Sequence, residues 1–152
     1  MFEFHKEKLF AYLMRMGGDY ELSRDILQET FRRYLEHYSG SDASPSLLYT
    51  IARNAFVDQV RRQARQTPLD EEPCDRGNGA EHEMLIRESY HGVLDALKAL
   101  AADEREVLSL AISSELSYQE IAEVMNLTVA NVKVKVHRAR KRIREILKGG
   151  QQ

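Results

Sequence analysis

The sequence predicts an all-α protein of two small helical domains joined by a flexible acidic linker, the second domain containing a helix-turn-helix. Apolar residues recur at helical spacing through most of the chain, and no stretch alternates convincingly with a period of two. The segment 67–82 interrupts this periodicity with proline, glycine and acidic residues. Residues 117–147 have the pattern of a short helix, a tight turn and a longer basic helix. We therefore expect domains over residues 1–66 and 83–152.

Three helices are predicted in the first domain. The first covers roughly residues 3–16 and ends at a glycine pair, after which Asp19 offers a cap for a second helix over residues 20–37. Ser44 followed by proline is a good N-cap and first-turn pair for a third helix over residues 45–65. The apolar residues on each helix are sufficient to pack the three together. On the second helix they are expected to be Leu22, Ile26, Phe31, Tyr34 and Leu35.

The second half of the third predicted helix is cationic. Asn54, Asp58, Arg61 and Arg65 share one stripe at helical spacing. Considered alone, this pattern favours an ordinary surface on which Asp58 pairs with Arg61 or Arg62, a contact worth about 0.3–0.5 kcal/mol.

The linker separates two basic regions. The chain of 152 residues has a formal net charge of −2, but its charges are segregated, with an acidic stretch between arginines near 53–65 and a basic block at 133–148. Cys74, in the linker, is the single cysteine, so the chain has no internal disulfide and no multi-cysteine zinc site. We interpret Cys74 as an incidental thiol.

The second domain is predicted to have four helices, of which the last two form the helix-turn-helix. A helix follows the linker, and Asp103 is expected to cap the next one. Ser117 and Glu120 have capping-box spacing at the start of the third helix, and Thr128 is a plausible N-cap for the fourth. On that fourth helix the core stripe is predicted to comprise Val132, Val136, Ala139, Ile143 and Ile146.

The opposite face of the fourth helix is cationic and is expected to be exposed. It carries Ala130, Lys133, Val134, His137, Arg138 and Lys141. The lopsided charge and the short turn favour DNA binding over an amphipathic hairpin whose charges are merely solvated, and both interpretations remain open at this point.

Enzymatic chemistry finds little support in the sequence. The five histidines are scattered, and none has acidic partners at metal-ligand spacing. We find no glycine-rich phosphate loop and no nucleophile motif. We therefore expect no catalytic residues, metal, cofactor or small-molecule substrate. Because no apolar run approaches membrane length and the N-terminus is not a signal peptide, we expect a cytoplasmic protein without direct membrane insertion.

Several motifs, in order along nearly the whole chain, resemble one family. The second predicted helix has the pattern D-x-x-Q-E-x-F, as Asp25-Ile26-Leu27-Gln28-Glu29-Thr30-Phe31. The third has Leu48-Tyr49-Thr50-Ile51-Ala52-Arg53-Asn54, followed by Asp58 and Arg61-Arg62. The second domain has Asp103-Glu104-Arg105-Glu106-Val107-Leu108, Leu116-Ser117-Tyr118-Gln119-Glu120-Ile121-Ala122 and Val136-His137-Arg138-Ala139-Arg140. Together they resemble the extracytoplasmic function (ECF) subgroup of bacterial RNA polymerase sigma factors.

The resemblance implies a function and a set of contact residues. Such factors bind core RNA polymerase and direct it to promoter DNA, and most are held inactive by an anti-sigma factor that clamps the two domains. By analogy, the core-binding residues are Asp25, Gln28, Glu29, Arg32 and Arg33. The −10 element would meet Arg53, Asn54, Asp58, Arg61, Arg62 and Arg65. The −35 element would be read by Thr128, Ala130, Asn131, Lys133, Val134, His137 and Arg138, with Arg140 and Lys141 also on the DNA-binding surface.

Among the predicted −35 residues, the chemistry of each side chain indicates whether it contacts a base edge or a phosphate. Arg138 is the best candidate for a contact to a guanine edge, whereas Lys133, Arg140 and Lys141 suit phosphate. The family's usual G-T-V-K-S-R is here Ala130-Asn131-Val132-Lys133-Val134-Lys135, so the promoter sequence cannot be taken from relatives.

Two other functions are compatible with a helix-turn-helix. One is a stand-alone transcriptional regulator that binds duplex DNA, and the other is a protein-binding module without a DNA role. The Asp25–Phe31 motif favours the sigma factor, because a plain regulator has no need of it. By the same analogy, the linker would let the domains pack together when inhibited and spread apart on polymerase.

Overall fold

A computed structural model of the chain describes residues 2–17, 19–38, 44–66, 92, 94–112 and 115–150. Every regular element in this part of the chain is an α-helix, which confirms the predicted fold class. The helices are α1 (Phe2–Gly17), α2 (Tyr20–Tyr38), α3 (Pro45–Gln66), α5 (Ala102–Ile112), α6 (Tyr118–Met125) and α7 (Val129–Gly150). The predicted linker, Cys74 and the start of the second domain lie outside the described residues.

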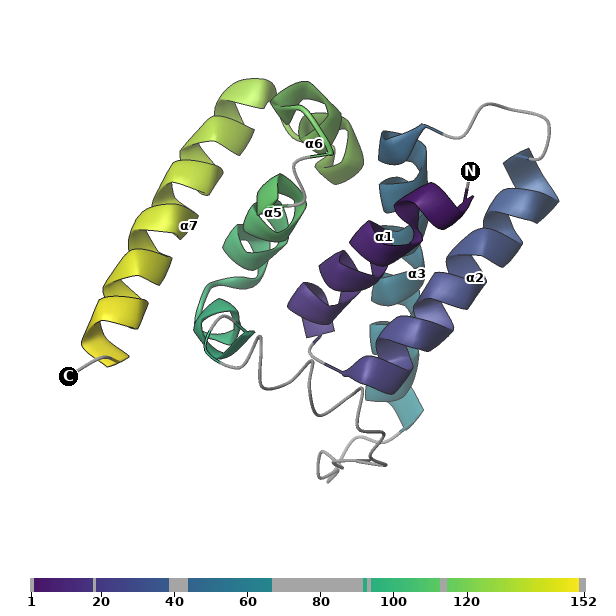
Figure 1. The fold of residues 1–152 in the computed structure, drawn as a ribbon, viewed down its shortest axis with the longest axis horizontal. Helices are drawn as coiled ribbons and strands as arrows, with labels where there is room; N and C mark the ends of the chain where they lie inside the picture. The colour runs from purple at the N-terminus through teal and green to yellow at the C-terminus, as the bar shows by residue number, and fades with distance from the viewer. Residues whose placement is uncertain are drawn as a thin grey trace.

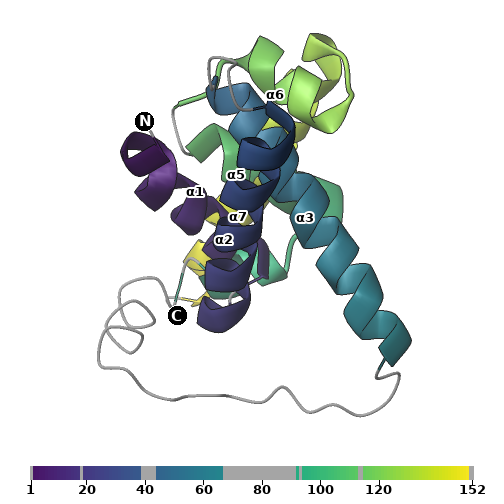
Figure 2. The same cartoon turned by 90° about the vertical axis from the view of Figure 1, so that its right-hand side faces the viewer.

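The N-terminal half is a three-helix unit in which α2 packs on both α1 and α3 (Figure 1). Its core is formed by fully buried side chains from α1 and α3, among them Leu9, Leu13 and Leu48. Tyr12 and Tyr49 meet edge to face at the centre, with ring centroids 5.3 Å apart. The C-terminal half of α3 projects beyond this core (Figure 2), so its side chains are largely exposed.

The C-terminal half contains the predicted helix-turn-helix. Ser117 and Glu120 form a complete capping box at the start of α6: the Ser117 hydroxyl accepts from the Glu120 amide, and the Glu120 carboxylate accepts from the Ser117 amide. Asn126 ends α6 in the left-handed conformation, with φ of 59°. Thr128 Oγ1 then accepts the Asn131 amide at 3.1 Å, as expected for the N-cap of α7.

The capping box gives a first test of this local structure. Ser117→Ala should lower the free energy of unfolding by about 1 kcal/mol, because the amide of Glu120 loses its acceptor at the helix start. Urea denaturation followed by circular dichroism measures the change. Ser117→Thr, which keeps the hydroxyl, should restore most of the stability. An alanine variant as stable as the wild type would contradict the role of the cap.

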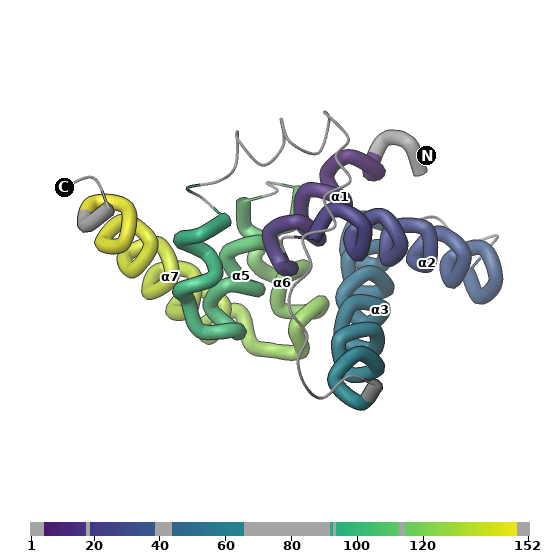
Figure 3. Tube along the Cα trace, turned by 90° about the horizontal axis from the view of Figure 1, so that it is seen from below, coloured from purple at the N-terminus to yellow at the C-terminus, as the bar shows by residue number. Residues whose placement is uncertain are grey.

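The two halves pack against each other. α5 and α6 lie between α7 and the three N-terminal helices (Figures 1 and 3), with α5 contacting α1 and α6 contacting α3. One cluster of buried apolar residues runs across the junction, from Leu13 and Ile51 on one side to Leu110 and Ile121 on the other. The described chain is therefore in a closed arrangement of its two helical halves.

Two local predictions are wrong. Asp103 does not cap α5, because the helix already begins at Ala102; its carboxylate instead binds Lys135 of α7 at 2.5 Å. Leu35 was expected on the buried side of α2 but is 54% exposed. The first error concerns a helix boundary, which a sequence pattern locates only to within a few residues, and the second concerns the edge of a helix face.

Candidate nucleic-acid interface

The outward face of α7 is the largest basic surface that the sequence predicted, and the structure exposes it. Val132, Val136 and Ala139 are 0%, 2% and 0% exposed, which fixes the inward face of the helix. The predicted reading residues are all classed as exposed: Thr128, Ala130, Asn131, Lys133, Val134, His137, Arg138, Arg140 and Lys141. A helix held in this way by α5 and α6 can enter a major groove without rearranging its own core.

Two basic residues of α7 form ion pairs within the protein. Lys135 binds Asp103, and the guanidinium of Arg142 lies 3.8 Å from Glu104, also on α5. The pKa of Asp103 is lowered, mainly by its hydrogen bond from Lys135. These contacts hold α7 on α5. Lys135 and Arg142 therefore contribute to helix packing, whereas the basic residues of the outward face are exposed.

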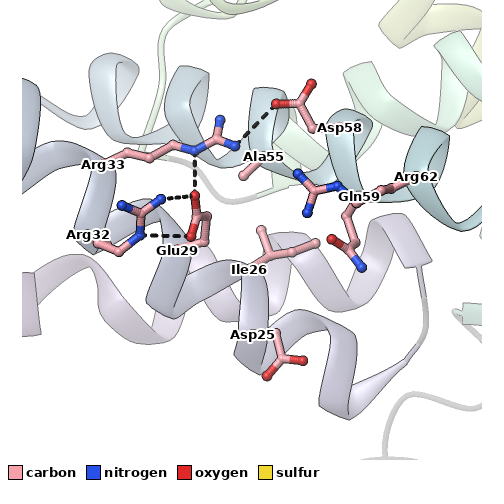
Figure 4. Close-up of a pocket in the computed structure, with 9 residues that line it drawn as sticks. All are labelled: Asp25, Ile26, Glu29, Arg32, Arg33, Ala55, Asp58, Gln59 and Arg62. Carbon is pink, nitrogen blue, oxygen red and sulfur yellow. Dashed lines mark hydrogen bonds and ion pairs between the residues drawn. The ribbon is translucent and has the colours of Figure 1, made fainter.

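A second charged surface lies between α2 and α3 (Figure 4). Glu29 is its centre: Arg32 Nη2 and Arg33 Nε donate to Glu29 Oε2 at 2.6 and 2.8 Å. Arg33 also donates to Asp58 of α3 at 3.2 Å, so one guanidinium joins the two helices. Asp58 thus pairs with Arg33 of α2, and the prediction that it pairs with Arg61 or Arg62 is wrong.

These residues line an open pocket of about 310 Å³ together with Asp25, Ile26, Ala55, Gln59 and Arg62. Asp25 and Gln28 are both exposed on α2. Of the five predicted core-binding residues, Asp25, Glu29, Arg32 and Arg33 line the pocket. The sequence predicted the residues of this surface but not their connection to α3 through Arg33.

The Glu29 carboxyl gives the network a defined pH dependence. Hydrogen bonds from Arg32 and Arg33 lower the pKa of Glu29 to about 2. A carboxyl whose pKa is depressed on folding stabilises the protein above its unfolded pKa, and this contribution is lost as the pH falls towards the folded value. We therefore expect the unfolding free energy of the wild type to fall more steeply than that of Glu29→Gln between pH 4.5 and 2. Urea unfolding at a series of pH values measures this, and parallel pH profiles would contradict it.

The projecting half of α3 presents the predicted −10 residues. Asn54, Asp58, Arg61, Arg62 and Arg65 are exposed, and the last four line a small open pocket of about 200 Å³. Three guanidinium groups within two turns make this end of α3 a strongly cationic surface.

Arg53 is the exception among the predicted −10 residues. Its guanidinium forms an ion pair with Glu106 of α5, in the other half of the chain. The Arg53 side chain is 28% exposed and that of Glu106 11%. In the closed arrangement Arg53 is therefore paired across the junction and only partly exposed, unlike the other predicted −10 residues.

Two further polar contacts accompany this pair along the junction. The buried Arg15 of α1 donates to the carbonyl oxygen of Ser109 in α5 at 2.7 Å. His5 Nδ1 lies 2.9 Å from a carboxylate oxygen of Glu115, and both side chains are buried. We call these three contacts, Arg53–Glu106, Arg15–Ser109 and His5–Glu115, the polar seam. The sequence did not predict the seam, since the partners in each contact lie far apart in the chain.

The contribution of the Arg53–Glu106 ion pair to stability can be measured by substitution. Arg53→Met should lower the unfolding free energy by about 1–3 kcal/mol, because Glu106 is left nearly buried without its cation. Adding Glu106→Leu should recover most of that loss, since neither charge then remains. Urea unfolding of both variants measures the difference. A double variant no more stable than the single one would show that the pair does not hold the junction.

Within the described residues, no group of three or more His, Cys, Asp or Glu side chains could hold a metal ion. None of the helices described is both long and apolar enough to cross a bilayer.

Comparison with known proteins agrees with this geometry. Residues 1–66 match the sigma-70 region 2 family, and residues 91–143 match the sigma-70 region 4 family. SigL of Mycobacterium tuberculosis, an ECF RNA polymerase sigma factor, is 30% identical over 95% of this chain and 85% of its own. The chain belongs to the ECF sigma factors. It is accordingly an alternative-type sigma factor that directs transcription initiation by RNA polymerase.

A second relative belongs to the same family, and two solved structures share the fold. SigM of Bacillus subtilis, another ECF sigma factor, is 29% identical over 99% of this chain and 94% of its own. The sigma factor RpoE of Bartonella quintana, solved with the anti-sigma factor NepR, has a TM-score of 0.75 at 23% identity and covers 96% of this chain and 93% of that one. CnrH, solved with the cytosolic domain of CnrY, has a TM-score of 0.70 at 23% identity, covering 97% of this chain and 84% of that one. These two similarities establish the shared fold.

Proposed function

We propose that this sigma factor divides its work among three surfaces. The outer face of α2 around Glu29 docks on core RNA polymerase, the projecting half of α3 meets the −10 element, and α7 reads the −35 element as duplex DNA. The observation that supports this best is the exposed basic face of α7, held by a buried stripe on the opposite side. The protein acts by binding rather than by catalysis, in the cytoplasm.

The chemistry of each surface suits its proposed target. Arg61, Arg62 and Arg65 can neutralise phosphates of an opening −10 region. Arg138 can donate twice to a guanine edge in the major groove, while Lys133 and Lys141 set the register on the backbone. The bonded Glu29, Arg32 and Arg33 group offers fixed charges of both signs to a protein partner.

The closed arrangement has a consequence for this function. The ion pair with Glu106 of α5 holds Arg53 at the junction between the two halves, with only part of its side chain exposed for a contact to promoter DNA. We infer that the polar seam opens when the factor binds polymerase and DNA, so that the halves reach separate elements. The seam supports this, because its polar groups can exchange their protein partners for water when the halves separate, while the apolar residues of the same junction would become covered by polymerase or exposed.

An anti-sigma factor is the proposed regulator. RpoE of Bartonella quintana was solved with the anti-sigma factor NepR, and CnrH was solved with the cytosolic domain of CnrY. We propose that such a partner binds the closed chain and keeps the seam from opening. Affinity purification from the native host, with identification of a stoichiometric partner, tests this, and recovery of the chain with core polymerase alone would contradict it.

The proposed division of labour is tested with a randomised promoter library. Purified chain and core polymerase together should select DNA carrying two short elements at a fixed spacing, and neither component alone should do so. Stable duplex binding by a dimer of the chain without polymerase would favour a stand-alone regulator. Absence of DNA selection even with polymerase would favour a protein-binding module.

A further inference from the structure

The first two turns of α7 expose an apolar side chain on the face proposed to read DNA. Val134 is 45% exposed, whereas Val132 and Val136 on the same helix are buried at 0% and 2%. Its orientation is fixed by that buried stripe, so Val134 must face outward whenever α7 is folded on α5 and α6. An isolated exposed valine is unremarkable by itself. Val134, however, lies among the residues of α7 that are proposed to contact DNA, so its side chain would face the bases.

The structure narrows the set of residues that can read base edges. Thr128 is engaged in capping, since its hydroxyl accepts the Asn131 amide at 3.1 Å. Lys135 is engaged with Asp103 at 2.5 Å. The exposed residues that remain near the start of α7 include Asn131 and Val134.

Val134 shares one column of the helix surface with Ala130 and Arg138. Residues four apart on an α-helix lie on nearly the same face, separated by about 6 Å along the axis. That distance is close to two base-pair steps of about 3.4 Å each. If Arg138 reaches a guanine, Val134 lies opposite a base pair one or two steps away.

The chemistry of valine selects one feature of the major groove. The donors and acceptors of a base edge offer nothing to an isopropyl group, but thymine carries a 5-methyl group there. A serine at this position could hydrogen-bond to several bases, whereas valine can gain only by covering a methyl group. The adjacent Ala130 methyl group makes the same part of the column apolar.

We propose that Val134 determines specificity by packing against the 5-methyl group of a thymine in the −35 duplex, one or two base pairs from the guanine contacted by Arg138. This inference rests on the proposed function, in which α7 reads the −35 element. It predicts a thymine at one position of the −35 element, whose sequence cannot be taken from relatives.

The test removes the methyl group from the DNA and the isopropyl group from the protein. Each thymine of the library-selected −35 element is replaced in turn by deoxyuridine, which lacks only the 5-methyl group. Promoter affinity of the assembled holoenzyme is measured on each duplex. For the wild type, we expect one position at which the replacement weakens binding about three- to fivefold, the effect of about one buried methyl group. Val134→Ala should bind the thymine promoter about as weakly and should be insensitive to the replacement.

A matched control is available on the same helix. Leu147 is 39% exposed near the far end of α7, so Leu147→Ala removes a comparable apolar group away from the reading turns. It should keep the wild-type response to deoxyuridine. Thermal unfolding of both variants shows whether the fold is retained, as expected for exposed side chains.

The outcomes separate this inference from the proposed function. A selected −35 element without thymine, or a deoxyuridine effect that persists in Val134→Ala, would overturn the inference alone. Failure of the holoenzyme to select any two-element promoter would overturn the proposed function and the inference with it.

Discussion

Arg138→Ala should reduce holoenzyme affinity for its promoter by about five- to a hundredfold, because a two-point contact with guanine contributes about 1–3 kcal/mol of base discrimination. The loss should be confined to one base pair of the −35 element, at which the variant should accept all four bases about equally. Affinity for core polymerase should be unchanged, since Arg138 is exposed on α7 and this helix lies away from α2 (Figure 1).

Two other basic residues of α7 serve as controls for Arg138. Lys141→Ala should weaken binding to all DNA sequences alike. It should also reduce the slope of log affinity against log salt concentration by about 1, as expected for the loss of one phosphate contact. Arg144→Ala removes an exposed arginine farther along the helix and should have little effect on base preference. Equal loss of specificity in all three variants would indicate that the basic face acts only through its overall charge.

Replacing Gln28 and Glu29 together by alanine should weaken binding to core polymerase by about thirtyfold or more. Truncating one member of a buried interfacial charge pair costs about 2 kcal/mol or more. The loss of Glu29 also removes the acceptor shared by Arg32 and Arg33, which donate to its carboxylate at 2.6 and 2.8 Å. Fluorescence anisotropy of labelled chain titrated with core polymerase measures the change.

Glu36→Gln is the matched control for this second prediction. It removes a different ion pair from the same helix, at 2.7 Å from Arg32, while leaving the link from Glu29 through Arg33 to Asp58 intact. Core binding should change by less than about threefold, as for an exposed ion pair. If Gln28 and Glu29 could be removed without weakening core binding, α2 would not be the docking surface.

Local chemistry made much of the fold predictable. The capping box of Ser117 and Glu120 and the Thr128 cap involve residues three apart, so the sequence alone defines both helix starts. The inward stripe of Val132, Val136 and Ala139 follows directly from the helical period. For the same reason, the exposed face of α7 was predicted residue by residue.

Contacts between distant segments were not predictable in this way. His5 and Glu115 are 110 residues apart, and Arg53 and Glu106 are 53 apart. No periodicity or motif links such residues, and each could equally have been a solvated surface charge. The same limit explains Asp58, whose partner Arg33 lies on another helix and not one turn away on its own.

The polar seam connects the fold to the function. It joins α1 and α3 to α5 and the turn before α6, and it engages Arg53, one of the residues proposed to meet the −10 element. A closed free chain and an open promoter-bound chain would therefore present different sets of cations. The central claim is that the two halves, packed together in the free protein, act apart on the promoter.

Single-molecule energy transfer between the halves tests this claim most directly. Dyes attached through Lys6→Cys on α1 and Glu145→Cys on α7, in a Cys74→Ser background, use two exposed positions. We predict high transfer efficiency in the free chain and low efficiency in a transcriptionally active complex with core polymerase and promoter. Transfer efficiency that is unchanged between the free chain and that active complex would contradict the account.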